Sequence, residues 1–169
     1  MAGKIPSELR AKTDESWAAL TRPLQGMEPH LERSDAPGEW TTRQVLCHLL
    51  FEPGWQPADF LRQFSERDLP HREIVPGLAD VTPERKAMTL TQLTDALDAQ
   101  RRAIFAYVDT LSDAELQGRK ARIPLFKQIQ GSDEVPIAVY VGALFGYHWA
   151  DHAGQLAKIR KAAGLPDAT

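Results

Sequence analysis

The feature that most constrains the fold is a long helical segment toward the C-terminal end, from about residue 134 to residue 163, with an apolar face. Its apolar positions recur with a helical period. Asp133 before it is a good N-cap, and Gly164 after it is a typical stop signal. We therefore expect one helix of about 45 Å, at about 1.5 Å per residue. A helix this apolar belongs in the centre of a helical bundle.

Three earlier segments carry the same helical period. The first covers about residues 7–25, where apolar residues recur every three or four positions. The second begins at Thr41, because Thr41 and Gln44 have capping-box spacing and Trp40 just outside suits a hydrophobic staple. Pro53 is expected to interrupt this helix before it continues.

The third segment opens with another capping box, formed by Thr89 and Gln92. Two long connections, residues 66–88 and 117–133, separate these segments. Connections of this length are unusual unless they cross the bundle or cover a site. The pattern predicts an all-α fold, a four-helix bundle with long cross-connections, in a single domain over residues 1–169.

Composition excludes several classes of function. The net charge of -3 gives no electrostatic reason to bind nucleic acid or an anionic membrane. Cys47 is the single cysteine, so no intrachain disulfide is expected. The first twenty or so residues are too charged for a signal-peptide core, and no apolar run is long enough to span a bilayer. A cytoplasmic protein is therefore expected.

Two histidines in the last helical segment suggest chemistry. His148 and His152 are four residues apart, which places them one turn apart and about 40° from each other around the axis. They share an apolar face with Val141, Leu144 and Ile159. Buried imidazoles are costly unless they find partners, and a metal ion would satisfy both. Ordinary hydrogen bonding in the core is the alternative.

A third histidine strengthens the metal hypothesis. His48 lies in the second helical segment on a face that includes Val45 and Trp55, so this face is expected to point at least partly inward. Two histidines from one helix and one from another are a common way to build a site in a bundle. Three imidazoles leave coordination positions open, as catalytic sites require. His30 and His71, in the connections, are interpreted as surface residues.

Three other residues near the histidines have more than one interpretation. Glu52, one turn after His48, would be a fourth ligand, a general base or a surface carboxylate. Asp151 would either orient the His148 imidazole or face water. Cys47 is better interpreted as a small buried apolar residue than as a ligand.

Small residues occupy every fourth position of the last helical segment. A glycine inside a helix costs about 1 kcal/mol relative to alanine, so the row needs a structural reason. It permits close approach of another helix, either within the bundle or at a homodimer seam. Its members are Ala138, Gly142, Gly146, Ala150 and Gly154.

Two segments resemble the DinB-like superfamily. The stretch Gly38-Glu-Trp-Thr-Thr-Arg-Gln-Val-Leu-Cys-His48 resembles the family's Gly-x-Trp-[Ser/Thr]-x-x-x-[Val/Ile]-Leu-x-His segment. The stretch His148-Trp-Ala-Asp-His152 resembles its last-helix signature. The resemblance implies a four-helix bundle, often dimeric, with zinc or nickel held by His48, His148 and His152. It also implies a thiol-dependent S-transferase or a metal-dependent hydrolase.

The leading functional hypothesis is therefore a metal-dependent enzyme that acts on a small molecule. The metal would activate water for hydrolysis or a low-molecular-weight thiol for transfer, with Glu52 as the candidate proton acceptor. The alternative is a bundle that binds a metal or a small molecule without catalysis. A metallopeptidase is disfavoured, because Asp151 replaces the glutamate of the H-x-x-E-H pattern.

Overall fold

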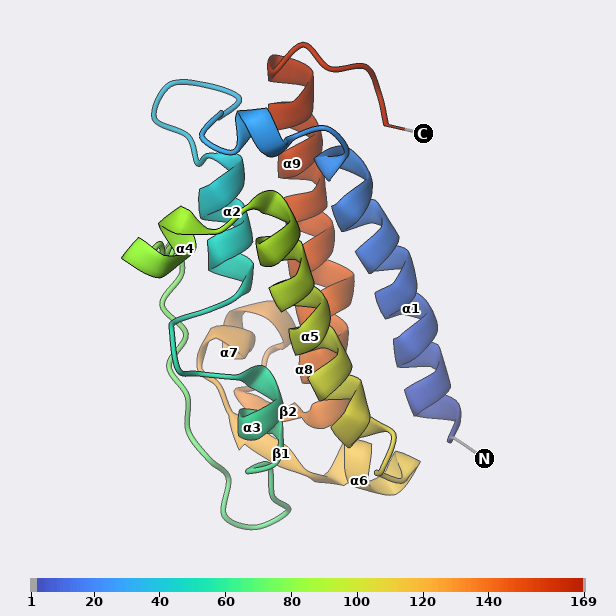
Figure 1. Cartoon of the computed structure of the whole chain (residues 1–169). Helices are drawn as coiled ribbons and strands as arrows, with labels where there is room; N and C mark the ends of the chain where they lie inside the picture. The colour runs from blue at the N-terminus through green and yellow to red at the C-terminus, as the bar shows by residue number, and fades with distance from the viewer. Residues whose placement is uncertain (1–2, 169) are drawn as a thin grey trace.

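The structure is a computed structural model that describes residues 3–168. Its long elements are α1 (Lys4–Thr21), α2 (Thr42–Leu49), α5 (Leu90–Val108) and a C-terminal rod (Figure 1). The rod consists of α8 (Ile137–Ala143), the π-helical η3 (Leu144–Trp149) and α9 (Ala150–Ala162). It packs against α1, while α2 packs against α5 and α9. The predicted four-helix bundle is therefore confirmed.

Local sequence signals account for the helix starts. Thr41 and Thr89 are the N-caps of α2 and α5, and each forms the complete capping box with the glutamine three residues later. At its other end α2 stops at Leu49, ahead of the predicted interruption at Pro53, and Phe51 takes a left-handed backbone with φ of 61°. The amide of Gln100, on α5, donates to the Leu49 carbonyl and so ties the end of α2 to α5.

The start of the last helix was predicted too early. Glu134–Pro136 form a short strand, β2, which pairs antiparallel with β1 (Lys120–Arg122). The N-cap is Pro136 rather than Asp133, whose carboxylate instead pairs with Arg122. Backbone pairing with a distant segment therefore overrides the local cap signal. The predicted stop at Gly164 is confirmed by its left-handed φ of 76°.

The two long connections meet at one end of the bundle. Isolated bridges join Ser65 to Lys120 and His71 to Arg122, so the first connection extends the small β1–β2 ribbon. The other elements between the long helices are short. They are the α-helices α3 (Pro57–Leu61), α4 (Pro83–Ala87), α6 (Asp113–Gly118) and α7 (Leu125–Gln130) and the 3-10 turns η1 (Arg22–Leu24) and η2 (Glu28–His30). α3 and α7 lie alongside the lower half of the rod in Figure 1.

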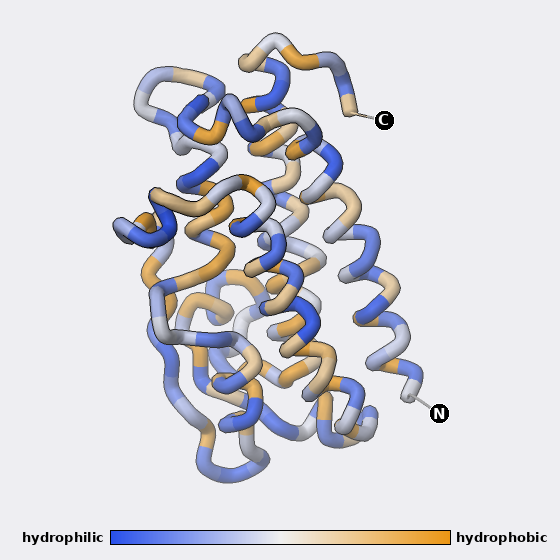
Figure 2. The backbone as a smooth tube through the Cα atoms, in the orientation of Figure 1, coloured by the Kyte–Doolittle hydropathy of each residue, from blue (hydrophilic) through white to orange (hydrophobic). Residues whose placement is uncertain are grey.

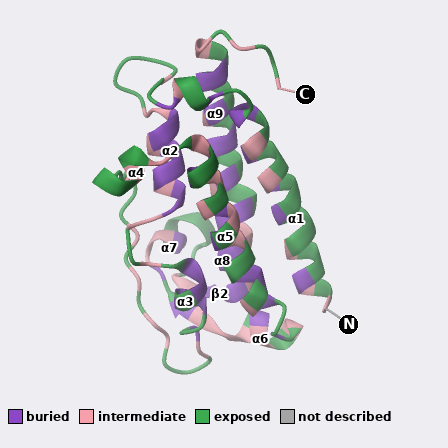
Figure 3. Ribbon diagram, in the orientation of Figure 1, coloured by how far each residue is buried: buried purple, intermediate pink, exposed green. Residues whose placement is uncertain are grey.

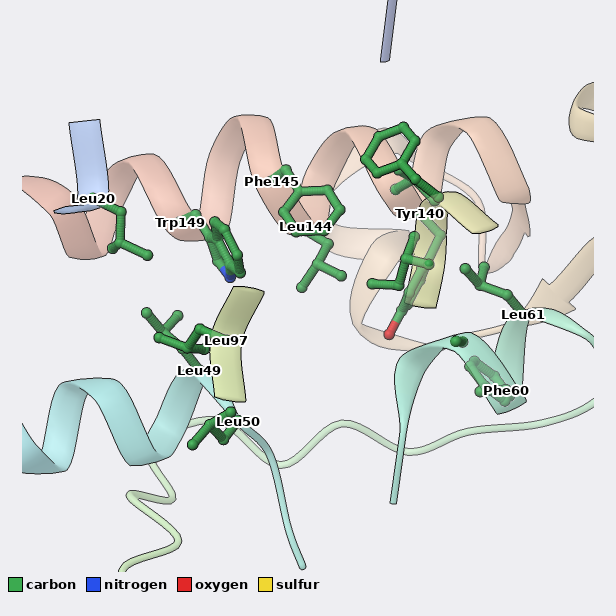
Figure 4. Close-up of a cluster of buried hydrophobic side chains, with 14 of the residues drawn as sticks. Leu20, Leu49, Leu50, Phe60, Leu61, Leu97, Tyr140, Leu144, Phe145 and Trp149 are labelled. Carbon is green, nitrogen blue, oxygen red and sulfur yellow. The ribbon is translucent and has the colours of Figure 1, made fainter. Parts of the chain in front are cut away.

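The buried face of the rod forms the centre of the core. Apolar residues line the inner faces of the helices in Figure 2, and the buried stretches in Figure 3 coincide with them. Phe145 and Trp149 are fully buried, and their rings meet edge to face at 4.6 Å (Figure 4). None of the described helices is long and apolar enough to cross a membrane.

The row of small residues lies beside α1 only in part. A side chain added at Gly142 would meet Leu9 of α1 at 3.8 Å, an ordinary contact distance. Gly146 and Gly154 have open space around them and are exposed. Packing within the bundle therefore explains one end of the row, and the homodimer seam stays a prediction.

Candidate metal centre

The structure brings together the three histidines that the sequence singled out. His48 comes from α2, His148 from η3 and His152 from α9. Their ring centroids are 4.8 to 4.9 Å apart, and their ligand nitrogens all lie within 4.8 Å of one another. The Nε2 atoms of His48 and His148 are 2.8 Å apart. Within residues 3–168, this is the cluster of metal-ligating side chains that the structure forms.

Two of the imidazoles form a hydrogen bond through the ring nitrogen that faces away from the cluster. His48 Nδ1 lies 2.6 Å from the carbonyl oxygen of Leu78, in the first long connection. His152 Nδ1 lies 2.8 Å from the Gln155 Oε1 atom, one turn further along α9. Because both partners are acceptors, each Nδ1 carries the proton and each Nε2 presents a lone pair toward the cluster. Such hydrogen bonds orient metal ligands and fix their tautomer.

Burial favours the neutral form of two of the three histidines. Burial, together with the smaller repulsion from the His152 and His48 rings, lowers the pKa of His148 to about 3. Burial also lowers the pKa of His152, although the hydrogen bond with Gln155 opposes this. Neutral imidazoles are the form that binds metals.

Aromatic rings enclose the histidines. Trp40, expected to staple the start of α2, has its ring 4.9 Å from the His48 ring and stacked on His152 at 6.2 Å. Phe51 lies 6.3 Å from His148. The left-handed backbone at Phe51 redirects the chain after α2 and so places this ring in the wall of the site.

The other candidate residues lie outside the cluster. The Glu52 carboxylate forms an ion pair with Arg72 at 2.6 Å. Burial would raise its pKa, but the hydrogen bond and charge of Arg72 outweigh this, so the pKa is lowered. Asp151 is exposed, which matches the water-facing interpretation. Cys47 is fully buried, as expected, and burial raises its pKa.

The two remaining histidines are separate from the cluster. His71 is exposed and pairs with Glu73 at 3.0 Å, while His30 is partly exposed at the end of η2. Leu78 and Gln155 were not predicted as supporting residues. Gln155 stands three residues after His152, a spacing that would have suggested contact. Leu78 acts through its backbone, which leaves no signal in the sequence.

A cavity of about 480 Å³ opens onto the cluster. All three histidines line it, together with Trp40 and apolar side chains from η3, α7 and the first long connection. Volume and lining are those of a small-molecule site, largely apolar with a few polar groups. The long connection therefore does cover a site, as its length suggested.

The donor set fits a divalent metal. Neutral imidazole nitrogens suit zinc and nickel, and two of the three Nε2 lone pairs are fixed by the hydrogen bonds on the opposite nitrogen. A cation among the three rings would satisfy the converging lone pairs of His48 and His152 together. A metal held by these three histidines would keep a position for an exchangeable ligand.

Comparison with known proteins supports the fold. The chain is similar in structure to YfiT from Bacillus subtilis, described as a probable metal-dependent hydrolase with an unusual four-helix bundle topology. The TM-score is 0.60 at 18% identity, over 95% of this chain and 89% of that one. No curated protein matches the sequence. The family model of the DinB superfamily matches residues 8–156, and the chain therefore belongs to the DinB superfamily.

Proposed function

We propose that this protein is a metal-dependent hydrolase that acts on a small molecule, with zinc or nickel held by His48, His148 and His152. The observation that carries the proposal is the convergence of these three imidazoles on one wall of an apolar cavity. The description of YfiT as a probable metal-dependent hydrolase supports the same reaction class.

The side chains around the cavity have distinct roles in this proposal. A divalent ion at the histidines supplies a Lewis acid that lowers the pKa of a water or thiol ligand. Trp40 and Phe51 restrict solvent around the imidazoles, which strengthens electrostatic interactions there. Glu52 lines the cavity and is the proposed proton acceptor, although its ion pair with Arg72 lowers its pKa and so makes it a weaker base.

Thiol-dependent transfer is the second candidate. The cavity, at about 480 Å³, has room for a small electrophile beside a low-molecular-weight thiol. In that case the thiol would take the position of the water at the histidines. A bundle that binds a metal or ligand without catalysis would have the same histidines but no turnover.

Elemental analysis of protein purified without a tag tests the metal site. We expect about one zinc or nickel per chain in the wild type and a loss of most of it in His148→Ala, with His71→Ala as the matched control. Loaded protein is then assayed on a panel of esters and amides, and on thiols with electrophiles. Equal metal content in all three proteins would refute the proposed ligands, and turnover only with thiols would favour the transferase.

A further inference from the structure

The cavity extends well beyond the histidines along the rod. Tyr140, on α8, lines it eight residues before His148, roughly 12 Å away along the helix axis. Aromatic contacts connect the two ends without a break: His148 to Phe51 at 6.3 Å, Phe51 to Trp55 at 4.9 Å, then Trp55 to Phe60 and Phe60 to Tyr140, both at 6.0 Å. The wall of the cavity is therefore apolar from the histidines to Tyr140.

The far end holds a hydroxyl group that has no partner in the protein. Tyr140 is only 4% exposed and lines the cavity, and its phenol forms no side-chain hydrogen bond with any residue between 3 and 168. Figure 4 shows its oxygen at the tip of the ring, pointing away from α8. Burial raises the pKa of the phenol, so it is a neutral donor. The hydroxyl oxygen is not among the fully enclosed polar atoms that lack a partner, so it is open to the cavity that Tyr140 lines, and a ligand oxygen there can accept its proton.

The charges nearest this phenol cancel each other. Arg72 and Glu52, which both line the cavity, form an ion pair, and the Arg72 guanidinium lies over the Trp55 ring at 3.7 Å. A carboxylate on the ligand would have to displace Glu52 from Arg72 and would face its negative charge. An uncharged acceptor, such as a ketone, ester or amide oxygen, has no such conflict.

The entrance to the cavity is also apolar. The most exposed large apolar side chains among the described residues include four that line this cavity: Tyr147 at 71%, Val75 at 63%, Ile129 at 58% and Leu78 at 52%. Exposed apolar groups gathered at one opening are typical of a binding site rather than of ordinary surface. They favour a ligand with an apolar body.

We infer that the site takes an elongated, mostly apolar substrate, with its reacting group at the three histidines and an uncharged hydrogen-bond acceptor at Tyr140. The inference rests on the proposed function for the reacting end. The apolar body lies along Phe51, Trp55 and Leu144, and the Tyr140 hydroxyl donates to the far oxygen. Tyr140 therefore selects the substrate by the position of this oxygen.

Calorimetry with hydroxamic acids tests the inference, because a hydroxamate head chelates zinc. Acetohydroxamate, octanohydroxamate and its 7-keto derivative are titrated into zinc-loaded protein. We expect octanohydroxamate to bind at least about thirty-fold more tightly than acetohydroxamate. The keto group should add about five-fold in the wild type. That gain should vanish in Tyr140→Phe and persist in Tyr107→Phe, whose hydroxyl pairs with Arg119 instead. Equal affinities along the series, or a keto gain unchanged in Tyr140→Phe, would overturn the inference.

Metal-free protein separates this inference from the proposed metal site. The uncharged dye N-phenyl-1-naphthylamine should fluoresce in the cavity, and 2-octanone should displace it better than 1-octene does. The advantage of the ketone should disappear in Tyr140→Phe. Dye displacement in protein that takes up no zinc would refute the metal site and leave the substrate class standing. Zinc uptake without dye binding would do the reverse.

Discussion

Arg85 connects the end of α2 to the loop that orients His48, and its replacement should damage both stability and metal binding. Its guanidinium donates to the carbonyl oxygens of Phe51 at 2.5 Å and Asp80 at 2.9 Å, with longer contacts to Cys47 and Leu50. Arg85→Met keeps the apolar stem but removes every donor. The two shorter bonds come from a charged group and contribute about 1.5 kcal/mol each, so the free energy of unfolding should fall by about 3 kcal/mol. For a chain of this length Tm should fall by about 6–12 °C.

Metal affinity provides the second measurement for Arg85. Leu78, whose carbonyl holds His48 Nδ1, is two residues from Asp80, so loss of the Arg85 bond frees this part of the loop. Loss of such support typically weakens metal binding by about ten-fold or more, measured by calorimetry with zinc. Lys86→Met is the control, since Lys86 is exposed on the same helix. If both variants melt and bind zinc alike, Arg85 does not have this role.

Three further outcomes follow from the site and the core. Gln155→Leu should weaken zinc binding about ten-fold, because it removes the acceptor of the His152 Nδ1 proton. Gln155→Glu should restore zinc binding, since a carboxylate also accepts this proton. Equal zinc affinities for the two variants would contradict this role. The pKa of His148 is lowered to about 3 in the folded protein, mainly by burial, so below about pH 6.5 the unfolded chain binds more protons than the folded one. The free energy of unfolding of the metal-free protein, measured by urea titration, should therefore fall from pH 6.5 toward pH 4. The fall should be less steep in His148→Gln. Phe145→Ala should cost about 3–5 kcal/mol in the same titrations, and a loss below about 1 kcal/mol would show that the core closes around the gap.

Much of the fold was predictable because its signals are local. The capping boxes at Thr41 and Thr89 lie within four residues, and both helices begin where the sequence indicates. The strand at Glu134–Pro136 was missed because it depends on pairing with Lys120–Arg122, more than ten residues away. Apolar residues that continue into the helix conceal such a boundary, since helical and extended patterns overlap over short runs.

The candidate site was predictable in its side chains but not in its supports. The spacing of His148 and His152 and the inward face of His48 are both legible in the sequence, and together they predict the cluster that the fold assembles. The carbonyl of Leu78 is a backbone group, and the ion pair of Glu52 with Arg72 joins segments twenty residues apart, so neither has a pattern to detect. The unpartnered phenol of Tyr140 likewise becomes visible only once its neighbours are known.

The π-helical turn at Leu144–Trp149 sets the relative orientation of the two halves of the rod. A π turn contains one more residue than an α turn, so each residue rotates the following side chains by a smaller angle. Tyr140 before the turn and His152 after it can therefore share one wall of the cavity. A homologue shortened by one residue before His148 would keep its H-x-x-x-H motif, yet the orientation of Tyr140 relative to the two histidines would change by about 100°. When homologues are aligned here, the number of residues between the positions of Tyr140 and His148 should therefore be compared as well as the histidines themselves.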